Sequence, residues 1–318
     1  EFNLFCIKKI FKNIFKNFFK LSLNDIYLKS LIDSYNPKII IGQNLEGYIF
    51  RIKNLCKNIF CIVYQHSFFY ECEKETYKKL YSGKKCDLFI SYSKDDTKFL
   101  SKLIEAEYIS LGSIKNNEII LNKSENKEIP LLLISEHRKS PSKLHLEQKI
   151  KLCEYIREFS KSKNIVPCVA LSAIRDDKKK YRRLDQEIDF YKKYLINFNW
   201  RNENSFKTAG KSNLIICLSS NMGIEVLSRG YKTVFFNLIG DKDKDQVNPY
   251  LIKNRPKYFF SNLNKETIKN RLNYYFDLKI KNWLLESNFT ENSIPFDEGN
   301  SKFKKIVNEI ASIKNENK

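Results

Sequence analysis

A short polar segment between two apolar runs is the part of this chain best suited to bind a ligand. Ser219-Ser220-Asn221-Met222-Gly223-Ile224-Glu225 follows the apolar residues 213–218 and precedes a second apolar run at 233–238. A strand that leads directly into a helix leaves the first N–H groups of that helix unpaired. These groups, together with the positive end of the helix dipole, bind anions. We therefore predict a phosphate or nucleotide site at this helix start.

The residues of this segment have separate expected roles. Ser219, Ser220 and Asn221 add side-chain donors to the backbone N–H groups, and Gly223 allows a phosphate to approach the backbone closely. Glu225 lies about one turn into the helix, where its carboxylate can accept hydrogen bonds from ribose hydroxyls. The plainer alternative is that Ser220 or Asn221 only caps the helix. That alternative leaves Glu225 unexplained, because a capping box places the acidic residue three positions after the cap.

Candidate acid–base and basic residues follow other expected strands. His66 can act as general base on an acceptor hydroxyl because histidine titrates near neutral pH, and Glu46 is a second candidate base. Glu136 is a candidate acid–base residue at the end of a later strand. Arg138 and Lys143 are candidates to neutralise a bound phosphate, Arg138 in a bidentate manner. Each of these side chains has an alternative interpretation as a structural or solvated residue.

The elements that must position these residues follow from the alternation of short β-branched runs with helical patterns, which is typical of α/β proteins with parallel sheets. In such sheets ligands bind at the carboxyl ends of the strands. The expected strands cover residues 38–41, 59–64, 88–91, 108–111, 130–135, 165–171, 213–218 and 233–238. The expected helices include residues 143–163, 184–196, 223–229, 265–286 and 301–313.

The length of 318 residues exceeds what one hydrophobic core usually supports. Residues 115–129 are polar, and we place the domain boundary there. The prediction is an N-terminal domain over residues 1–126 and a C-terminal domain over residues 127–318, whose final helices pack back across the hinge. The first segment is helical rather than a strand, so we expect the first sheet to lack an N-terminal strand.

The net charge of +20, from 57 Lys and Arg against 37 Asp and Glu, favours anionic partners such as nucleotide phosphates, lipid head groups or acidic glycans. Nucleic acid is not an expected partner, because the lysines are scattered and RNA-binding motifs are absent. Three histidines, and eight cysteines without a CxxC pair, argue against a metal site and for reduced, buried thiols. The acidic loop 241–245 lacks the glycine and terminal glutamate of a calcium loop. We expect no cofactor and no metal.

Residues 7–20 form an amphipathic pattern with phenylalanines and isoleucines on one side and lysines on the other. Two interpretations remain open: contact with a membrane surface, or packing on the first sheet. No apolar run is long enough to span a bilayer. We expect a cytoplasmic protein, with residues 7–20 as the candidate contact with the inner face of the cytoplasmic membrane.

Several segments resemble the family of O-antigen and surface-carbohydrate biosynthesis proteins. The segments are residues 37–44, 62–67, 86–117, 219–230 and 295–300. Members of that family carry Asp-Asn after their second strand and Asn-Gly after their third, where this chain has Gln43-Asn44 and His66-Ser67. The resemblance implies a glycosyltransferase of the GT-B type, with two facing Rossmann-like domains, the donor in the C-terminal domain and the acceptor on the N-terminal side. It also implies that no bound metal is needed.

The activity implied is transfer of a sugar from a nucleotide-sugar to a bacterial surface polysaccharide or O-antigen acceptor, which can be a lipid-linked glycan. The donor remains open between CMP-linked sugars of the Kdo or sialic type and UDP- or GDP-linked sugars. Two other activities remain open as well. One is a sugar-nucleotide epimerase of the same architecture, and the other is a non-catalytic glycan-binding protein.

Overall fold

In the computed structural model, the described residues are 9, 12–14, 21–70, 73–119, 127–136, 141–171, 178–201, 203–238, 249–287 and 294–316. The chain forms two compact units. The first comprises Glu1–Phe68, Glu75–Asn117 and Gly299–Lys318, and the second comprises Phe69–Lys74 and Glu118–Glu298. The chain thus leaves the first unit after residue 117 and returns to it at residue 299, whereas we predicted a single division after residue 126.

The first unit contains a four-stranded parallel sheet whose strands follow their order in the chain. Each strand overlaps the residues predicted for it. The strands are β1 (Ile39–Gln43), β2 (Phe60–Tyr64), β3 (Lys84–Ser91) and β4 (Ile104–Ser110). The helices are α2 (Leu23–Tyr35) before β1 and α3 (Tyr48–Leu55), α4 (Lys74–Tyr81) and α5 (Lys94–Leu100) between the strands.

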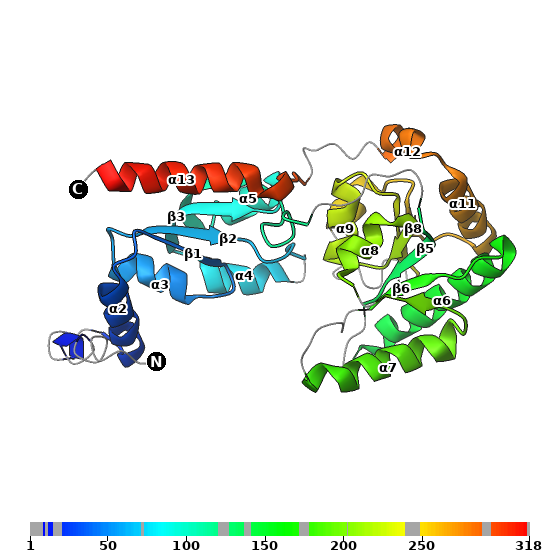
Figure 1. Cartoon of the computed structure of the whole chain (residues 1–318), viewed down its shortest axis with the longest axis horizontal. Coiled ribbons are helices and arrows are strands. Elements are labelled where there is room, and N and C mark those ends of the chain that lie inside the picture. The colour runs from blue at the N-terminus through cyan, green and yellow to red at the C-terminus, as the bar shows by residue number, and fades with distance from the viewer. Residues whose placement is uncertain are drawn as a thin grey trace. The chain divides into compact units, whose positions relative to one another are not determined.

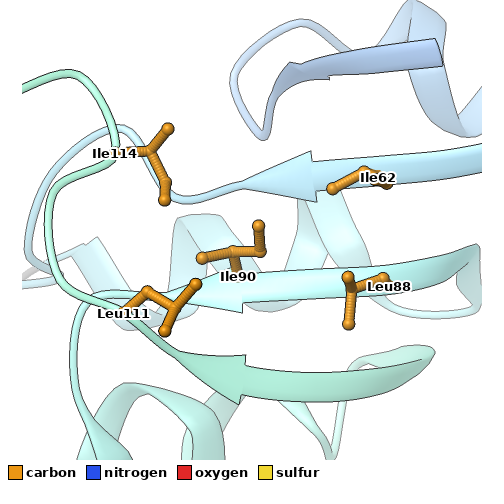
Figure 2. Close-up of a cluster of buried hydrophobic side chains, with 5 residues drawn as sticks. All are labelled: Ile62, Leu88, Ile90, Leu111 and Ile114. Atoms are coloured by element: carbon orange, nitrogen blue, oxygen red, sulfur yellow. The ribbon is translucent and has the colours of Figure 1, made fainter. Parts of the chain in front are cut away.

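The last helix of the chain completes the core of the first unit. Figure 2 shows the buried cluster on this sheet, formed by Ile62, Leu88, Ile90, Leu111 and Ile114. Helix α13 (Ser301–Glu316), drawn in red along the first sheet in Figure 1, packs on this cluster. Its apolar residues recur every three or four positions and so share one helix face. The residues in contact are Phe303, Ile306, Val307 and Ile310.

The second unit contains a six-stranded parallel sheet in the order β10-β9-β8-β5-β6-β7. Its strands are β5 (Ile129–Ile134), β6 (Cys168–Ala170), β7 (Asn199–Trp200), β8 (Ser212–Cys217), β9 (Thr233–Asn237) and β10 (Phe259–Ser261). The prediction missed β7 and β10, which have two and three residues. Strands this short show no periodic pattern that a sequence reading can detect.

The helices of the second unit are α6 (Lys143–Lys163), α7 (Lys178–Tyr194), α8 (Ser205–Gly210), α9 (Asn221–Ser228), α10 (Pro249–Asn254), α11 (Lys265–Asp277) and α12 (Ile280–Ser287). The bounds of α6 agree with the prediction because both ends carry local signals. The Ser142 side chain accepts a hydrogen bond from the His145 N–H, and Asn164 takes the left-handed conformation with φ 53°.

The single helix predicted over residues 265–286 is wrong, because the structure divides it into α11 and α12. Leu278 adopts an extended conformation with ψ 127° at the break. The buried Lys232 donates from Nζ to the carbonyl oxygens of Tyr275, Phe276 and Leu278 at 3.1, 3.2 and 2.7 Å. A lysine that directly precedes β9 thus satisfies carbonyls at the end of α11, which a continuous helix would have bonded internally. Its burial lowers the pKa of Lys232 to about 8.

The observed architecture is therefore an α/β fold with two parallel sheets, as predicted. Across the described ranges, no helix has the length and apolar character needed to cross a membrane. Most of residues 7–20, the predicted membrane contact, lie outside the described residues.

Candidate functional site

The strand order of the second sheet defines where a ligand is expected to bind. The chain proceeds from β5 to β6 and β7 on one side, and from β8 to β9 and β10 on the other. In open parallel sheets ligands bind at such a reversal, at the carboxyl ends of the two central strands. Glu136 follows β5, and Ser219-Ser220 follows β8. Residues that the sequence singled out thus follow both central strands.

The carboxylate of Glu136 lies on the β8–α9 turn and binds its backbone. Oε1 accepts hydrogen bonds from the N–H groups of Leu218, Ser219 and Ser220 at 2.9, 2.7 and 3.0 Å, and Oε2 accepts from Ser219 Oγ at 2.8 Å. Successive N–H groups that converge on one oxygen form an anion-binding site of the kind called a nest. The turn therefore binds an anion in this structure, and that anion belongs to the protein.

This geometry gives Glu136 a role that the sequence did not predict. Both of its carboxylate oxygens accept hydrogen bonds from the β8–α9 turn, so donors of the protein hold the side chain in place. The residue that precedes it is also fixed. Ser135 Oγ donates to the buried Glu187 and accepts from Tyr191 Oη at 2.9 Å. The backbone carbonyl oxygen of Glu136 lies 3.3 Å from Nε2 of His145 in α6.

Gly223 has a packing role that the sequence did not predict. A Cβ atom at this position would lie 2.4 Å from Cys217 Sγ and 3.0 Å from Phe235 Cε1. The glycine is therefore required for close packing of α9 on β8 and β9. The predicted ribose ligand Glu225 is buried, with 5% of its surface exposed.

The start of α9 also differs from the alternative interpretation, in which Ser220 or Asn221 only caps the helix. Ser220 is the N-cap residue by its backbone conformation, with ψ 132°, but its side chain makes no capping hydrogen bond among the described residues. Asn221 is the first helical residue, and its Oδ1 accepts a hydrogen bond from Tyr70 Oη at 2.9 Å. Both side chains border the turn without capping the helix.

Tyr70 is the functional candidate that the sequence reading missed. It belongs to the short segment Phe69–Lys74, which is part of the second unit although the chain on both sides belongs to the first. Its hydroxyl lies 3.0 Å from the carbonyl oxygen of Ser219 as well as 2.9 Å from Asn221 Oδ1. No local pattern around Tyr70 signals a contact with residues about 150 positions later.

Replacing Tyr70 with phenylalanine should lower the free energy of unfolding of the second unit by about 1 kcal/mol, the net value of a typical hydrogen bond within a protein. Thermal and urea unfolding followed by circular dichroism measure this change. Tyr274→Phe is the matched control, because it removes an exposed hydroxyl bound to Glu286 and should change stability little. Equal effects of the two substitutions would contradict a role for Tyr70 at the turn.

His66 and Glu46 lie together at the carboxyl edge of the first sheet. The backbone N–H of His66 donates to Asn44 Oδ1 at 2.8 Å, and its carbonyl accepts from Tyr92 Oη at 3.2 Å, so the ring itself is not used to hold the loop. Glu46 Oε2 accepts from Tyr48 Oη at 2.7 Å. Burial and the charge of Lys115 lower the pKa of His66, while Glu46 raises it. The ring is half-buried, and these effects favour its neutral form.

Of the remaining predicted residues, the structure describes Lys143. It is the exposed first residue of α6. Arg138 lies outside the described residues, as does the acidic loop 241–245. In the part of the chain that the structure describes, no three His, Cys, Asp or Glu side chains are close enough to hold a metal ion.

A protein-family model described as "putative O-antigen biosynthesis protein" matches residues 68–311. The chain belongs to this family. The match includes the whole β5–β10 sheet, Glu136 and the β8–α9 turn, and it confirms the resemblance found in the sequence. No curated protein matches the chain.

Solved structures share the fold of this O-antigen biosynthesis family member at low sequence identity. A "putative UDP-N-acetylglucosamine 2-epimerase" from Listeria monocytogenes has a TM-score of 0.56 and 13% identity, over 92% of this chain and 82% of that chain. The S. aureus MnaA–UDP co-structure has a TM-score of 0.53 and 13% identity, over 99% of this chain and 83% of that chain. An alpha,alpha-trehalose-phosphate synthase (UDP-forming) from Burkholderia vietnamiensis has a TM-score of 0.53 and 7% identity, over 92% of this chain and 78% of that chain. Identities this low show the fold alone.

Proposed function

We propose that this O-antigen biosynthesis family member is a glycosyltransferase whose second unit binds a nucleotide-sugar through the donor phosphate at the β8–α9 turn. One observation carries the proposal: three backbone N–H groups and one serine hydroxyl of this turn converge on a carboxylate at the switch point of the sheet. A phosphate oxygen is an acceptor of the same kind and charge. Binding there would neutralise charge that builds on the leaving nucleotide.

The comparisons support a nucleotide-sugar as the substrate. The S. aureus neighbour is described with UDP, and the Burkholderia vietnamiensis neighbour is described as UDP-forming. The family description supports an O-antigen or other surface polysaccharide as the acceptor. In this proposal the sugar donor is UDP-, GDP- or CMP-linked, the acceptor can be a lipid-linked glycan, and the reaction takes place in the bacterial cytoplasm or at the inner face of its membrane.

We propose that His66 is the general base for the acceptor hydroxyl. The factors that lower its pKa keep the imidazole neutral, which is the form that accepts a proton. No metal or cofactor takes part in this proposal: His66 would take the proton of the acceptor hydroxyl, and the N–H groups of the β8–α9 turn would stabilise the negative charge on the leaving phosphate.

A nucleotide panel tests the donor site. We expect at least one of CMP, UDP and GDP to raise the melting temperature, and a nucleotide at about 100 times its Kd should stabilise the folded chain by about 2.7 kcal/mol. Ser219→Ala should weaken this binding, because it removes the one serine hydroxyl of the turn that donates to the bound anion. Ser228→Ala, at the other end of α9, is the matched control and should leave it unchanged. Failure of all three nucleotides to bind would refute the donor site.

An epimerase remains the second candidate, because two neighbours with this fold are described as a "putative UDP-N-acetylglucosamine 2-epimerase" from Listeria monocytogenes and as UDP-GlcNAc 2-epimerase from Methanocaldococcus jannaschii. The two activities differ in a simple measurement. A transferase releases free nucleotide in proportion to the acceptor added, whereas an epimerase converts the nucleotide-sugar without acceptor and leaves the nucleotide attached.

A further inference from the structure

Glu136 occupies the position in which the proposed donor phosphate would bind. We infer that Glu136 is an internal anion that closes the phosphate site, and that a donor phosphate must displace its carboxylate to bind. The inference rests on the proposed function for the identity of the incoming anion. Its geometric basis does not depend on the proposed function, because the hydrogen bonds between Glu136 and the β8–α9 turn are present in the chain itself.

The turn has one position for an anion. Oε1 of Glu136 lies 2.7–3.0 Å from three backbone nitrogens in succession, those of Leu218, Ser219 and Ser220. A phosphate oxygen bound to the same N–H groups would have to occupy the same volume. Two unit charges this close together also repel each other strongly in a half-buried site. Binding of a phosphate and binding of the Glu136 carboxylate are therefore mutually exclusive.

The backbone of Glu136 is fixed, so its side chain is the part that moves. The Ser135 N–H donates to Ala170 O in the neighbouring strand at 3.0 Å, and Ser135 Oγ is held between Glu187 and Tyr191. The Glu136 side chain itself is half-buried. Rotation about its own bonds is enough to free the turn, and no strand has to shift. The site therefore has a closed state and an open state.

Such an equilibrium lowers the apparent affinity for phosphate. The apparent Kd equals the intrinsic Kd divided by the fraction of molecules in the open state. If Glu136 closes the turn in about nine molecules of ten, removal of its charge tightens phosphate binding about tenfold. A residue that only shaped the turn would have the opposite effect, because its loss would distort the N–H groups and weaken binding.

The experiment compares wild type with Glu136→Gln, which keeps the length of the side chain but removes its charge and one acceptor. The probes are inorganic phosphate and UDP, titrated calorimetrically into the full chain. Glu128→Gln is the matched control: it removes one negative charge from an exposed glutamate of the same unit, bound to Arg201 rather than to the turn. We expect E136Q to bind both probes at least about tenfold more tightly than wild type and E128Q to bind them like wild type.

The outcomes separate this inference from the proposed function. Unchanged or weaker binding of UDP by a folded E136Q overturns the inference, even if wild type binds UDP and the proposed function stands. Tighter binding of inorganic phosphate by E136Q, with no nucleotide bound by either protein, supports the closed site and refutes the donor proposal. If E136Q and E128Q gain affinity for the probes equally, the gain comes from the change in net charge, and the inference is overturned.

A second variant keeps the test decisive if E136Q does not fold. Glu136→Asp retains the charge but shortens the side chain by one methylene, so it no longer reaches the three N–H groups with the same geometry. It should also bind phosphate more tightly than wild type, by a smaller factor than E136Q. Binding by E136D that is no tighter than wild type overturns the inference.

Discussion

Replacing His66 with alanine is expected to slow sugar transfer by about 10²–10⁴-fold, the contribution typical of a positioned general base. The substitution should leave the fold intact, because the bonds that hold this loop come from the His66 backbone, to Asn44 and Tyr92, and not from the ring. The measurement is the acceptor-dependent rate of nucleotide release. The melting-temperature shift caused by nucleotide should be unchanged, and a variant with the wild-type rate would rule out His66 as the base.

The pH dependence of the rate gives an independent check on the same residue. Burial and Lys115 lower the pKa of His66 below its ordinary 6.5, and Glu46 raises it. A base acts only when neutral, so the rate should rise with pH and level off, with an inflection below 6.5. Lys115→Gln should move the inflection to higher pH, and Glu46→Gln should move it to lower pH. An inflection that stays fixed in both variants would belong to another group.

Gly223→Ala is expected to reduce the free energy of unfolding of the second unit by about 2 kcal/mol, as overpacking of a core does. The added Cβ would lie 2.4 Å from Cys217 Sγ and 3.0 Å from Phe235 Cε1, and both of these side chains are fully buried. Helix α9 would have to move away from the sheet, which also displaces the β8–α9 turn. Urea unfolding measures the loss, and nucleotide binding should weaken with it.

A double-mutant cycle identifies the steric cause. Cys217→Ala removes the sulfur atom that the new Cβ meets at 2.4 Å, and the remaining contact with Cys217 Cβ is an ordinary 3.5 Å. The pair Gly223→Ala and Cys217→Ala should therefore be more stable than the sum of the single effects predicts, by about 1 kcal/mol or more. Strict additivity would show that the destabilisation of Gly223→Ala does not come from this contact.

The prediction of the fold was successful where the signal is local. Helix α6 was predicted at its observed bounds because Ser142 and Asn164 mark its two ends. The central strands were predicted because buried parallel strands are continuous apolar runs. The break between α11 and α12 was missed, since the amino group that binds the carbonyls at the break belongs to Lys232, more than 40 positions earlier in the chain.

The structure adds to the predicted site a contact that the sequence did not indicate. The sequence indicated an anion site at Ser219-Ser220, and the structure shows that the turn binds a carboxylate there. It also indicated Glu136, but as an acid–base group. A sequence pattern shows that a carboxylate follows a strand; it does not show which backbone groups that carboxylate meets across the neighbouring strand.

By itself, the sequence determined the α/β class, the strand-to-helix turn after β8 and the family resemblance, because these depend on residues adjacent in the chain. Only the tertiary structure decided that β5 and β8 are neighbours, so that Glu136 reaches the turn. It also decided that Tyr70 contacts Asn221 and that Gly223 packs on Cys217 and Phe235. The physical reason is common to all of these contacts: they join residues far apart in sequence, and only the packing of the strands and helices brings such residues within bonding distance.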